Sequence, residues 1–331
     1  MKVIIAGGSG QVGTILSRAF HAAGHETIVL SRHPQPAPWR VLPWDGETQG
    51  PWGSEFENAD VVINLAGRSV NCRYGPTNRR IIMESRVNST RVIGEAIART
   101  ACPPRLWLQA STATIYAHRY DAPNDEVDGI LGGDEPNLPD TWVFSLGIAN
   151  AWERTFHEAD TPQTRKVLLR SAIVMSPDRG GAFDVFLRLT RLGLGGRAGN
   201  GRQFVSWIHD EDFIRAVFWL IEHPELDGVV NLSAPHPLPN ADFMRALRRA
   251  WGIGFGLPAW KWMIEVGTFF LRTESELVLK SRRVISRRLP ESGFKFHYST
   301  WDKAAQDLCN RVRKKRPATK ISPTTQAVES C

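Results

Sequence analysis

The glycines near the N-terminus have the spacing of a phosphate-binding turn. Gly7, Gly10 and Gly13 follow the apolar run at residues 2–6 and precede a stretch with helical periodicity. Glycine permits unusual dihedral angles, lets a pyrophosphate approach bare backbone, and lets the next helix pack closely on the strand. The helix amides and dipole would face the phosphates, so we predict dinucleotide binding. The predicted contacts from this turn are Gly7, Gly8, Ser9, Gly10, Gln11, Val12 and Gly13.

The second predicted strand ends in residues that suit a phosphorylated adenine ribose. In a fold that binds NAD, a carboxylate at this position accepts hydrogen bonds from the 2′-hydroxyl. Here the strand ends in Ser31 and Arg32. A hydroxyl and a guanidinium suit a 2′-phosphate by charge and by forked hydrogen bonding, which favours NADP(H) as the cofactor. The alternative is that Arg32 points into solvent or stacks on the adenine.

Two further strands contribute candidate cofactor contacts. Residues 60–66 are a buried-looking strand that ends in small residues, which would let a dinucleotide cross the carboxyl edge of the sheet. A later strand, residues 166–175, carries Arg170 where the chain returns to the cleft. A structural ion pair is the alternative role for Arg170. The predicted contacts are Asn64, Leu65, Ala66, Gly67 and Arg170.

The composition is that of an ordinary soluble protein. Of 331 residues, 42% are hydrophobic and 23% charged, and the most apolar stretch, residues 259–271, is interrupted by Lys261 and Glu265. We therefore expect no membrane span. The first strand follows Met1 directly, which leaves no room for a secretory signal and indicates a cytoplasmic protein. The four cysteines are scattered without the spacing of metal ligands, so no metal site is predicted.

The net charge of +7 is concentrated near the C-terminus. Residues 311–331 hold six lysines and arginines against Glu329, a net charge of +5. We interpret this segment as a basic disordered tail and expect no specific nucleic-acid binding. A weak electrostatic tether to RNA or a membrane is the alternative.

The chain resembles the extended branch of the short-chain dehydrogenase/reductase superfamily. The resemblance begins with the glycine turn, the NLAG sequence at residues 64–67 and STATIY at 111–116. The second half resembles epimerase-like proteins with a C-terminal domain of unknown function. Its matching segments are AWE at 151–153, LLRSAIVMSPDRGGAF at 168–183, GNGRQFVSWIHDEDF at 199–213, NLSAPHPLPNADF at 231–243 and SRRVISRRLPESGFKF at 281–296.

This resemblance implies an α/β fold with two lobes. A Rossmann-like parallel sheet with helices on both faces would occupy mainly residues 1–175, with later strands from about 203–232. A small C-terminal α/β lobe would occupy mainly residues 176–310 and cover the cofactor cleft. The stripe formed by Trp260, Met263, Val266 and Phe270 has helical spacing and suits a core or a subunit contact, so a homodimer is one expected assembly.

The resemblance also implies catalytic positions, and this chain departs from them. Thr112, with Ser111 beside it, occupies the position of the hydroxyl that orients the substrate oxygen. Family members carry an acid/base tyrosine and a lysine on the following helix. Counting back from Glu153, these positions hold Ser145 and Ala149, which supply neither an acidic phenol nor a charge.

A nearby tyrosine could replace the missing phenol. Tyr116 lies four residues beyond Thr112, so it is a candidate substitute acid. The alternative for Tyr116 is aromatic packing beneath the loop.

These features predict an NADP(H)-binding, epimerase-like oxidoreductase that acts on a small molecule. Arg197 and Arg202 lie in a glycine-rich turn that could recognise an anionic substrate, with a solvated basic loop as the alternative. The missing tyrosine and lysine leave a second class open. That alternative is a catalytically silent NADP(H)-binding regulatory protein, because some members of the resembling group are labelled cell-division inhibitors.

Overall fold

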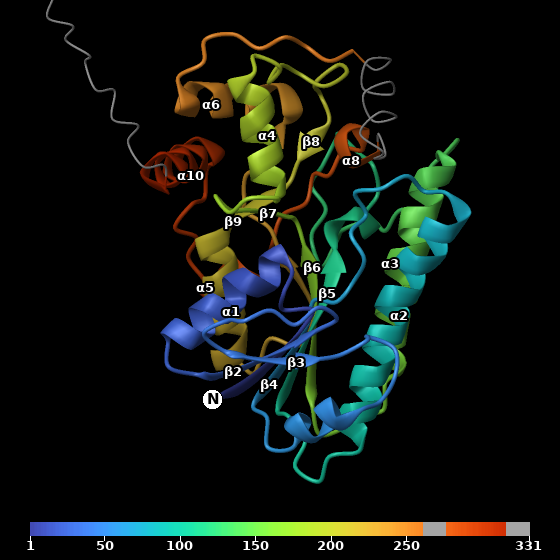
Figure 1. Ribbon diagram of the computed structural model, residues 1–331. Coiled ribbons are helices and arrows are strands. Elements are labelled where there is room, and N and C mark those ends of the chain that lie inside the picture. The colour runs from blue at the N-terminus through green and yellow to red at the C-terminus, as the bar shows by residue number, and fades with distance from the viewer. Residues whose placement is uncertain (261–275, 316–331) are drawn as a thin grey trace, which may run out of the picture.

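Seven strands form one parallel sheet, in the order β3-β2-β1-β4-β5-β6-β10 (Figure 1). The computed structural model describes residues 1–260 and 276–315 of the chain. The predicted Rossmann-like sheet is therefore confirmed. The strands are β1 (Lys2–Ala6), β2 (Glu26–Ser31), β3 (Arg40–Pro43), β4 (Val61–Asn64), β5 (Leu106–Thr112), β6 (Arg165–Ser171) and β10 (Gly228–Leu232).

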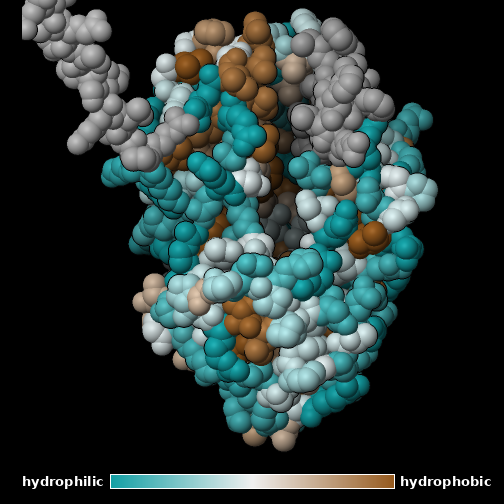
Figure 2. All heavy atoms as spheres, in the orientation of Figure 1, coloured by the Kyte–Doolittle hydropathy of each residue, from teal (hydrophilic) through white to brown (hydrophobic). Residues whose placement is uncertain are grey.

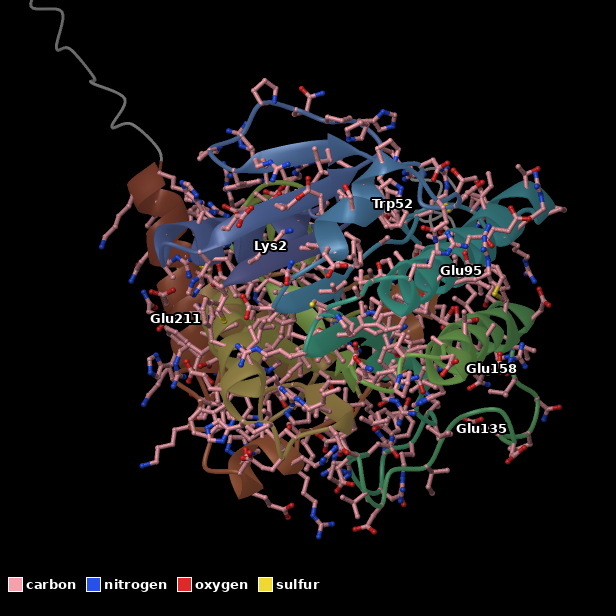
Figure 3. The ribbon with its side chains drawn as sticks, turned by 90° about the horizontal axis from the view of Figure 1, so that it is seen from below. Lys2, Trp52, Glu95, Glu135, Glu158 and Glu211 are labelled. Carbon is pink, nitrogen blue, oxygen red and sulfur yellow. The ribbon has the colours of Figure 1, made fainter. Side chains whose placement is uncertain are left out.

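Helices cover both faces of this sheet. Successive side chains of a strand point to opposite faces, so Val3 and Ile5 of β1 pack on one side and Ile4 on the other. In the view along the sheet, Glu95 and Glu158 lie on one side and Glu211 on the other (Figure 3). The first side carries α2 (Pro76–Ala98) and α3 (Asp140–Glu158), and the second carries α1 (Gln11–Ala22) and α5 (Asp210–Glu222).

The strand order reverses between β1 and β4. From β1 the chain runs to β2 and β3 on one side, and then crosses to β4, β5 and β6 on the other. The loops after β1 and β4 therefore diverge at the carboxyl edge of the sheet and leave a crevice between them. This topological switch point is where open α/β sheets bind ligands.

A smaller lobe lies beyond the carboxyl edge of the sheet (Figure 1). Its core is apolar and aromatic, with Phe243 stacked on Trp301 at 4.1 Å between ring centroids. The space-filling view shows a hollow between this lobe and the sheet domain (Figure 2). The lobe contains α4 (Ala182–Arg191), α6 (Asn240–Trp251), α10 (Trp301–Lys315) and the strand pairs β7 (Ile173–Met175) with β9 (Trp207–His209) and β8 (Phe204–Val205) with β11 (Leu238–Pro239).

Short helices complete the described chain. They are the 3-10 helices η1 (Pro51–Phe56) and η2 (Ala113–Ile115) and the single-turn helices α8 (Glu276–Leu279) and α9 (Arg288–Glu291). None of the helices in residues 1–260 and 276–315 is long and apolar enough to cross a bilayer. Of the predicted apolar stripe, Met263, Val266 and Phe270 lie outside the described residues.

The prediction that a disordered tail begins at residue 311 is wrong for its first five residues. Residues 311–315 continue α10. Arg311 donates two hydrogen bonds of 2.8 Å to the carboxylate of Asp210, which is buried at the start of α5. A buried carboxylate needs a cationic partner, so this ion pair holds the end of α10 against the sheet domain. Residues 316–331 lie outside the described part of the chain.

Candidate functional site

The glycine turn lies between β1 and α1 at the switch point. Gly7 has φ +74°, and its amide donates to the Leu30 carbonyl over 2.9 Å. A Cβ on Gly7 would lie 2.8 Å from Cα of Ala66, so the turn after β1 touches the backbone after β4. A Cβ on Gly13 would lie 2.4 Å from Cα of Gly8. Only glycine at these positions permits the turn and the close approach of α1.

A pocket opens beside this turn and contains most of the predicted cofactor contacts. Eight predicted residues line it: Gly7, Ser9, Gly10, Ser31, Arg32, Leu65, Ala66 and Gly67. Gly8, Gln11, Val12, Gly13 and Asn64 are not part of its lining. Asn64 is fully buried, and its Oδ1 accepts the Ala66 amide over 3.0 Å, so it shapes the loop after β4.

The end of β2 presents hydroxyls and a cation to the pocket. Ser31 Oγ donates to Ser9 Oγ over 2.9 Å and accepts the His33 amide over 3.2 Å, which links the end of β2 to the glycine turn. Arg32 is exposed and forms no ion pair with any described carboxylate. Its guanidinium is therefore available to a bound anion.

A loop and a helix face that were not predicted from the sequence complete the pocket. The loop follows β3 and buries Trp44, whose indole nitrogen has no hydrogen-bond partner among the described residues. Burial raises the pKa of Asp45, but hydrogen bonds from Thr48 and from the Glu47 amide outweigh it and leave that pKa below its usual range. The lining residues on this loop and helix are Trp44, Asp45, Gly46, Glu47, Ile81, Glu84 and Ser85, and Leu30 and His33 at the end of β2 also line the pocket without having been predicted. The Asp45-Gly46 turn sequence was the one signal that could have pointed to them.

Thr112 ends β5, and its hydroxyl donates no hydrogen bond to any of the described residues. Its Oγ1 accepts the Thr114 amide over 3.1 Å, and its side chain is half-buried. The hydroxyl can therefore still donate to a substrate oxygen. Ser111, beside it, is buried and donates to Glu153 Oε1 over 2.6 Å. Ser111 thus contributes to the interior of the protein, whereas Thr112 is half-buried at the end of β5.

Arg170 and Tyr116 lie in a buried network instead of the pocket. Arg170 donates two hydrogen bonds to the Glu153 carboxylate, of 2.9 and 2.7 Å, and one of 3.1 Å to the Tyr116 hydroxyl. The Tyr116 hydroxyl in turn donates to Asn231 over 3.0 Å. Arg170 thus has the ion-pair role given above as its alternative, because buried Glu153 requires its charge.

Tyr116 likewise has the packing role given as its alternative. It is 2% exposed, and burial raises the pKa of its phenol. A phenol with a raised pKa, whose one proton is already donated to Asn231, is a poor general acid. The geometry therefore disagrees with the predictions of Tyr116 as a substitute acid and of Arg170 as a cofactor contact.

The two positions of the family's tyrosine and lysine contact the C-terminal part of the chain. Ser145 Oγ donates to Glu276 Oε2 over 2.7 Å. Ala149 is fully buried and packs in one apolar cluster with Ala113 and Val284. Residues after 275 therefore fill the space that longer side chains on α3 would occupy.

The two arginines predicted to recognise an anion do not converge on the pocket. Both are exposed, and neither lines it. The Arg202 guanidinium lies 5.9 Å from the Tyr120 ring centroid, and that of Arg197 lies 5.7 Å from the Trp260 ring centroid. Within residues 1–260 and 276–315, no group of three or more His, Cys, Asp or Glu side chains could hold a metal ion.

Comparison with known proteins identifies the family to which the chain is similar. Residues 3–137 match the NAD dependent epimerase/dehydratase family, and residues 261–308 match a domain of unknown function, DUF1731. The chain is 31% identical over 318 residues to the epimerase family protein SDR39U1 of Mus musculus, which covers 93% of this chain and 99% of that protein. It is 32% identical over 299 residues to an epimerase family protein of Mycobacterium tuberculosis, covering 90% and 94% of the two chains.

A solved structure extends this similarity to the fold. The crystal structure of human epimerase family protein SDR39U1 (isoform 2) with NADPH matches with a TM-score of 0.81 at 28% identity, covering 94% of this chain and 99% of that chain. Both lobes are thus shared with that protein. The glycine turn at the β1–β4 switch point and these similarities together show that the chain belongs to the epimerase/dehydratase family of extended short-chain dehydrogenases/reductases, in the subgroup that carries the DUF1731 domain.

Proposed function

We propose that the protein is an NADP(H)-binding, epimerase-like oxidoreductase that acts on a small-molecule substrate. The observation that carries this proposal is that Ser31 and Arg32 line the same pocket as Gly7 and Gly10. The glycine turn suits the pyrophosphate, and the uncommitted guanidinium suits a 2′-phosphate. The NADPH named for the human SDR39U1 structure supports the same cofactor for this chain.

The proposed roles follow from these positions. Bound NADPH would supply the reducing equivalents, and the chain would supply binding and orientation. Arg32 and Ser31 would hold the 2′-phosphate, while Ala66 and Gly67 would let the dinucleotide cross the sheet edge close to the backbone. Thr112, with its hydroxyl proton uncommitted, would orient the substrate oxygen.

Calorimetry with NADPH and NADH tests the cofactor assignment. We expect the unaltered protein to bind NADPH more tightly, and Arg32→Asp to lose that preference, by about 10- to 100-fold, because a charge-assisted hydrogen bond is replaced by repulsion. Arg197→Asp is a matched control, since Arg197 is equally exposed but lies outside the pocket. An unchanged preference in Arg32→Asp would overturn the 2′-phosphate assignment.

A catalytically silent NADP(H)-binding regulatory protein is the second candidate. It is favoured by Ser145 and Ala149 at the two positions where the family carries its acid/base pair. A panel of carbonyl compounds, including anionic ones, separates the two candidates. NADPH oxidation that disappears in Thr112→Val supports the enzyme, whereas tight NADPH binding without oxidation of any member favours the regulatory protein.

A cytoplasmic location is also proposed. Cys72, Cys102 and Cys309 are free thiols in the described part of the chain, as expected in a reducing compartment. Recovery of the protein in the soluble cytoplasmic fraction of its own cells would agree with this proposal. Recovery with membranes or outside the cell would contradict it.

A further inference from the structure

The segment from residue 276 to 286 inserts between the C-terminal lobe and the sheet domain. In Figure 1, α8 lies at the upper end of α3. The Glu276 carboxylate accepts the Ser145 hydroxyl, and Val284 packs on Ala149, so this segment meets α3 at both positions of the missing pair. Small side chains on α3 thus make room for groups from elsewhere in the chain.

This segment brings a buried lysine to the end of β5. Lys280 is 2% exposed, and its Nζ donates to the Thr114 carbonyl over 2.9 Å. Arg282 Nε donates to Thr114 Oγ1 over 3.1 Å, and the Thr114 amide donates to Thr112 Oγ1 over 3.1 Å. One residue, Thr114, therefore connects Lys280 to the Thr112 hydroxyl.

The charges around Lys280 come from two parts of the chain. Arg282 and Glu276 lie on the same segment, and Glu135 and His118 lie on the loop between β5 and α3. The Lys280 ammonium also lies 5.6 Å from the Trp142 ring centroid. The Lys280 ammonium thus donates one of its three protons to the Thr114 carbonyl and lies beside the Trp142 ring.

We propose that Lys280 is the proton donor to the substrate oxygen that Thr112 orients, in place of the family's tyrosine. This inference rests on the proposed function. It assigns to the DUF1731 domain the role of completing the active site. Thr114 positions Lys280 and Thr112 relative to each other, and Glu276 fixes the segment on α3 through Ser145.

The reduction of a carbonyl substrate balances with these groups. The carbonyl carbon accepts a hydride, two electrons and a proton, from NADPH, which is oxidised to NADP⁺. The π bond of the carbonyl breaks, and its oxygen accepts one proton from the Lys280 ammonium. The product is an alcohol, and the neutral amine of Lys280 regains its proton from solvent.

The acidity of Lys280 suits this role. Burial lowers the pKa of its ammonium to about 8, an effect to which Arg282 adds and which Glu276 and Glu135 oppose. A proton donor works best when its pKa lies near the working pH, and an ordinary lysine near 10.4 is too weak an acid. The geometry and the acidity therefore favour the same residue.

Nitrogen NMR of the ¹⁵N-lysine-labelled full chain tests this inference without a known substrate. The chain has nine lysines, and Lys280→Arg identifies the Lys280 signal by its loss. We expect its pKa to be lower in the NADP⁺ complex than in the NADPH complex, because the oxidised nicotinamide ring is cationic and the reduced ring is neutral. A lysine that only holds two lobes together would not sense the oxidation state of the ring.

Lys166 is a matched control. Its Nζ also donates to backbone carbonyls, of Phe156, His157 and Ala159, but it lies at the amino end of β6, five residues before Ser171, which pairs with Thr112. We expect its pKa to be equal in the two complexes. An equal Lys280 pKa in both complexes would overturn the inference and leave cofactor binding intact, whereas failure of both cofactors to bind in calorimetry would overturn the proposed function as well.

Discussion

The hydroxyl of Ser145 donates a 2.7 Å hydrogen bond to the carboxylate of Glu276, 131 residues further along the chain. Ser145 stands at the position where the family carries its acid/base tyrosine, and Glu276 belongs to the DUF1731 region. Helix α3, which has Ser145 in place of the tyrosine, is therefore hydrogen-bonded to the DUF1731 region. This contact makes α3 and the C-terminal segment parts of one site.

The buried ion pair below that site is predicted to be essential for stability. In Arg170→Met the carboxylate of Glu153 stays buried without a cation, since only the Ser111 hydroxyl remains bonded to it among the contacts described above. Leaving a buried charge unpaired costs about 3–5 kcal/mol. Urea unfolding should show a loss of this size in the free energy of unfolding.

Two further variants control this prediction. Arg245→Met breaks an exposed ion pair with Asp242 and should cost less than about 1 kcal/mol. The double variant Glu153→Gln with Arg170→Met removes both charges and should recover part of the loss. If Arg170→Met and Arg245→Met have equal free energies of unfolding, the buried ion pair contributes no more to stability than the exposed one.

The close contact of α1 with the glycine turn predicts a difference between two helical glycines. In Gly13→Ala the added methyl would meet the Gly8 backbone at 2.4 Å, so α1 must move. We expect a loss of about 1–3 kcal/mol in the free energy of unfolding and weaker NADPH binding. Gly147→Ala adds the same methyl to α3, where no described atom outside its own helix lies within 4 Å, and should stabilise by about 0.5–1 kcal/mol. If both variants bind NADPH like the parent, the turn does not depend on this packing.

His209 predicts how stability depends on pH. Its side chain is fully buried and stacked on Tyr298, and burial lowers the pKa of its imidazole, with Arg311 acting in the same direction and Asp210 and Asp307 opposing. As the pH falls through about 6.5, the unfolded chain binds a proton that the folded chain does not accept. Stability should therefore fall below that pH.

The variant His209→Gln isolates this contribution. The free energy of unfolding, measured from pH 7 to pH 5, should have a smaller slope in the variant than in the parent, whatever their difference at pH 7. The slope is compared because the substitution also removes the contact with Asp307. Identical slopes would mean that His209 has the same pKa in the folded and the unfolded chain.

The part of the site that is local in sequence could be predicted. The glycine turn and the Ser31-Arg32 pair each lie within a few residues of a strand end, so their pattern also fixes where they lie in a parallel sheet. The parallel sheet with helices on both faces and the smaller C-terminal lobe followed from the family resemblance. The sequence therefore indicated the cofactor half of the site.

The other half depends on contacts between distant segments. Arg170 lies in a strand as predicted, but its ion-pair partner is Glu153 on a helix, and no periodicity in the sequence specifies that pairing. The loop at residues 44–47 reaches the pocket only through the tertiary fold. Lys280 contacts Thr114 across 166 residues of chain. No local pattern in the sequence predicts such contacts between residues that are far apart along the chain.

A crystal structure of the NADPH complex tests the central claim most directly. We predict that the 2′-phosphate will lie within hydrogen-bonding distance of the Arg32 guanidinium and the Ser31 hydroxyl, with the pyrophosphate at the turn that begins at Gly7. The nicotinamide ring is expected beside Thr112. A 2′-phosphate exposed to solvent with Arg32 turned away, or a dinucleotide bound outside the β1–β4 crevice, would contradict the account.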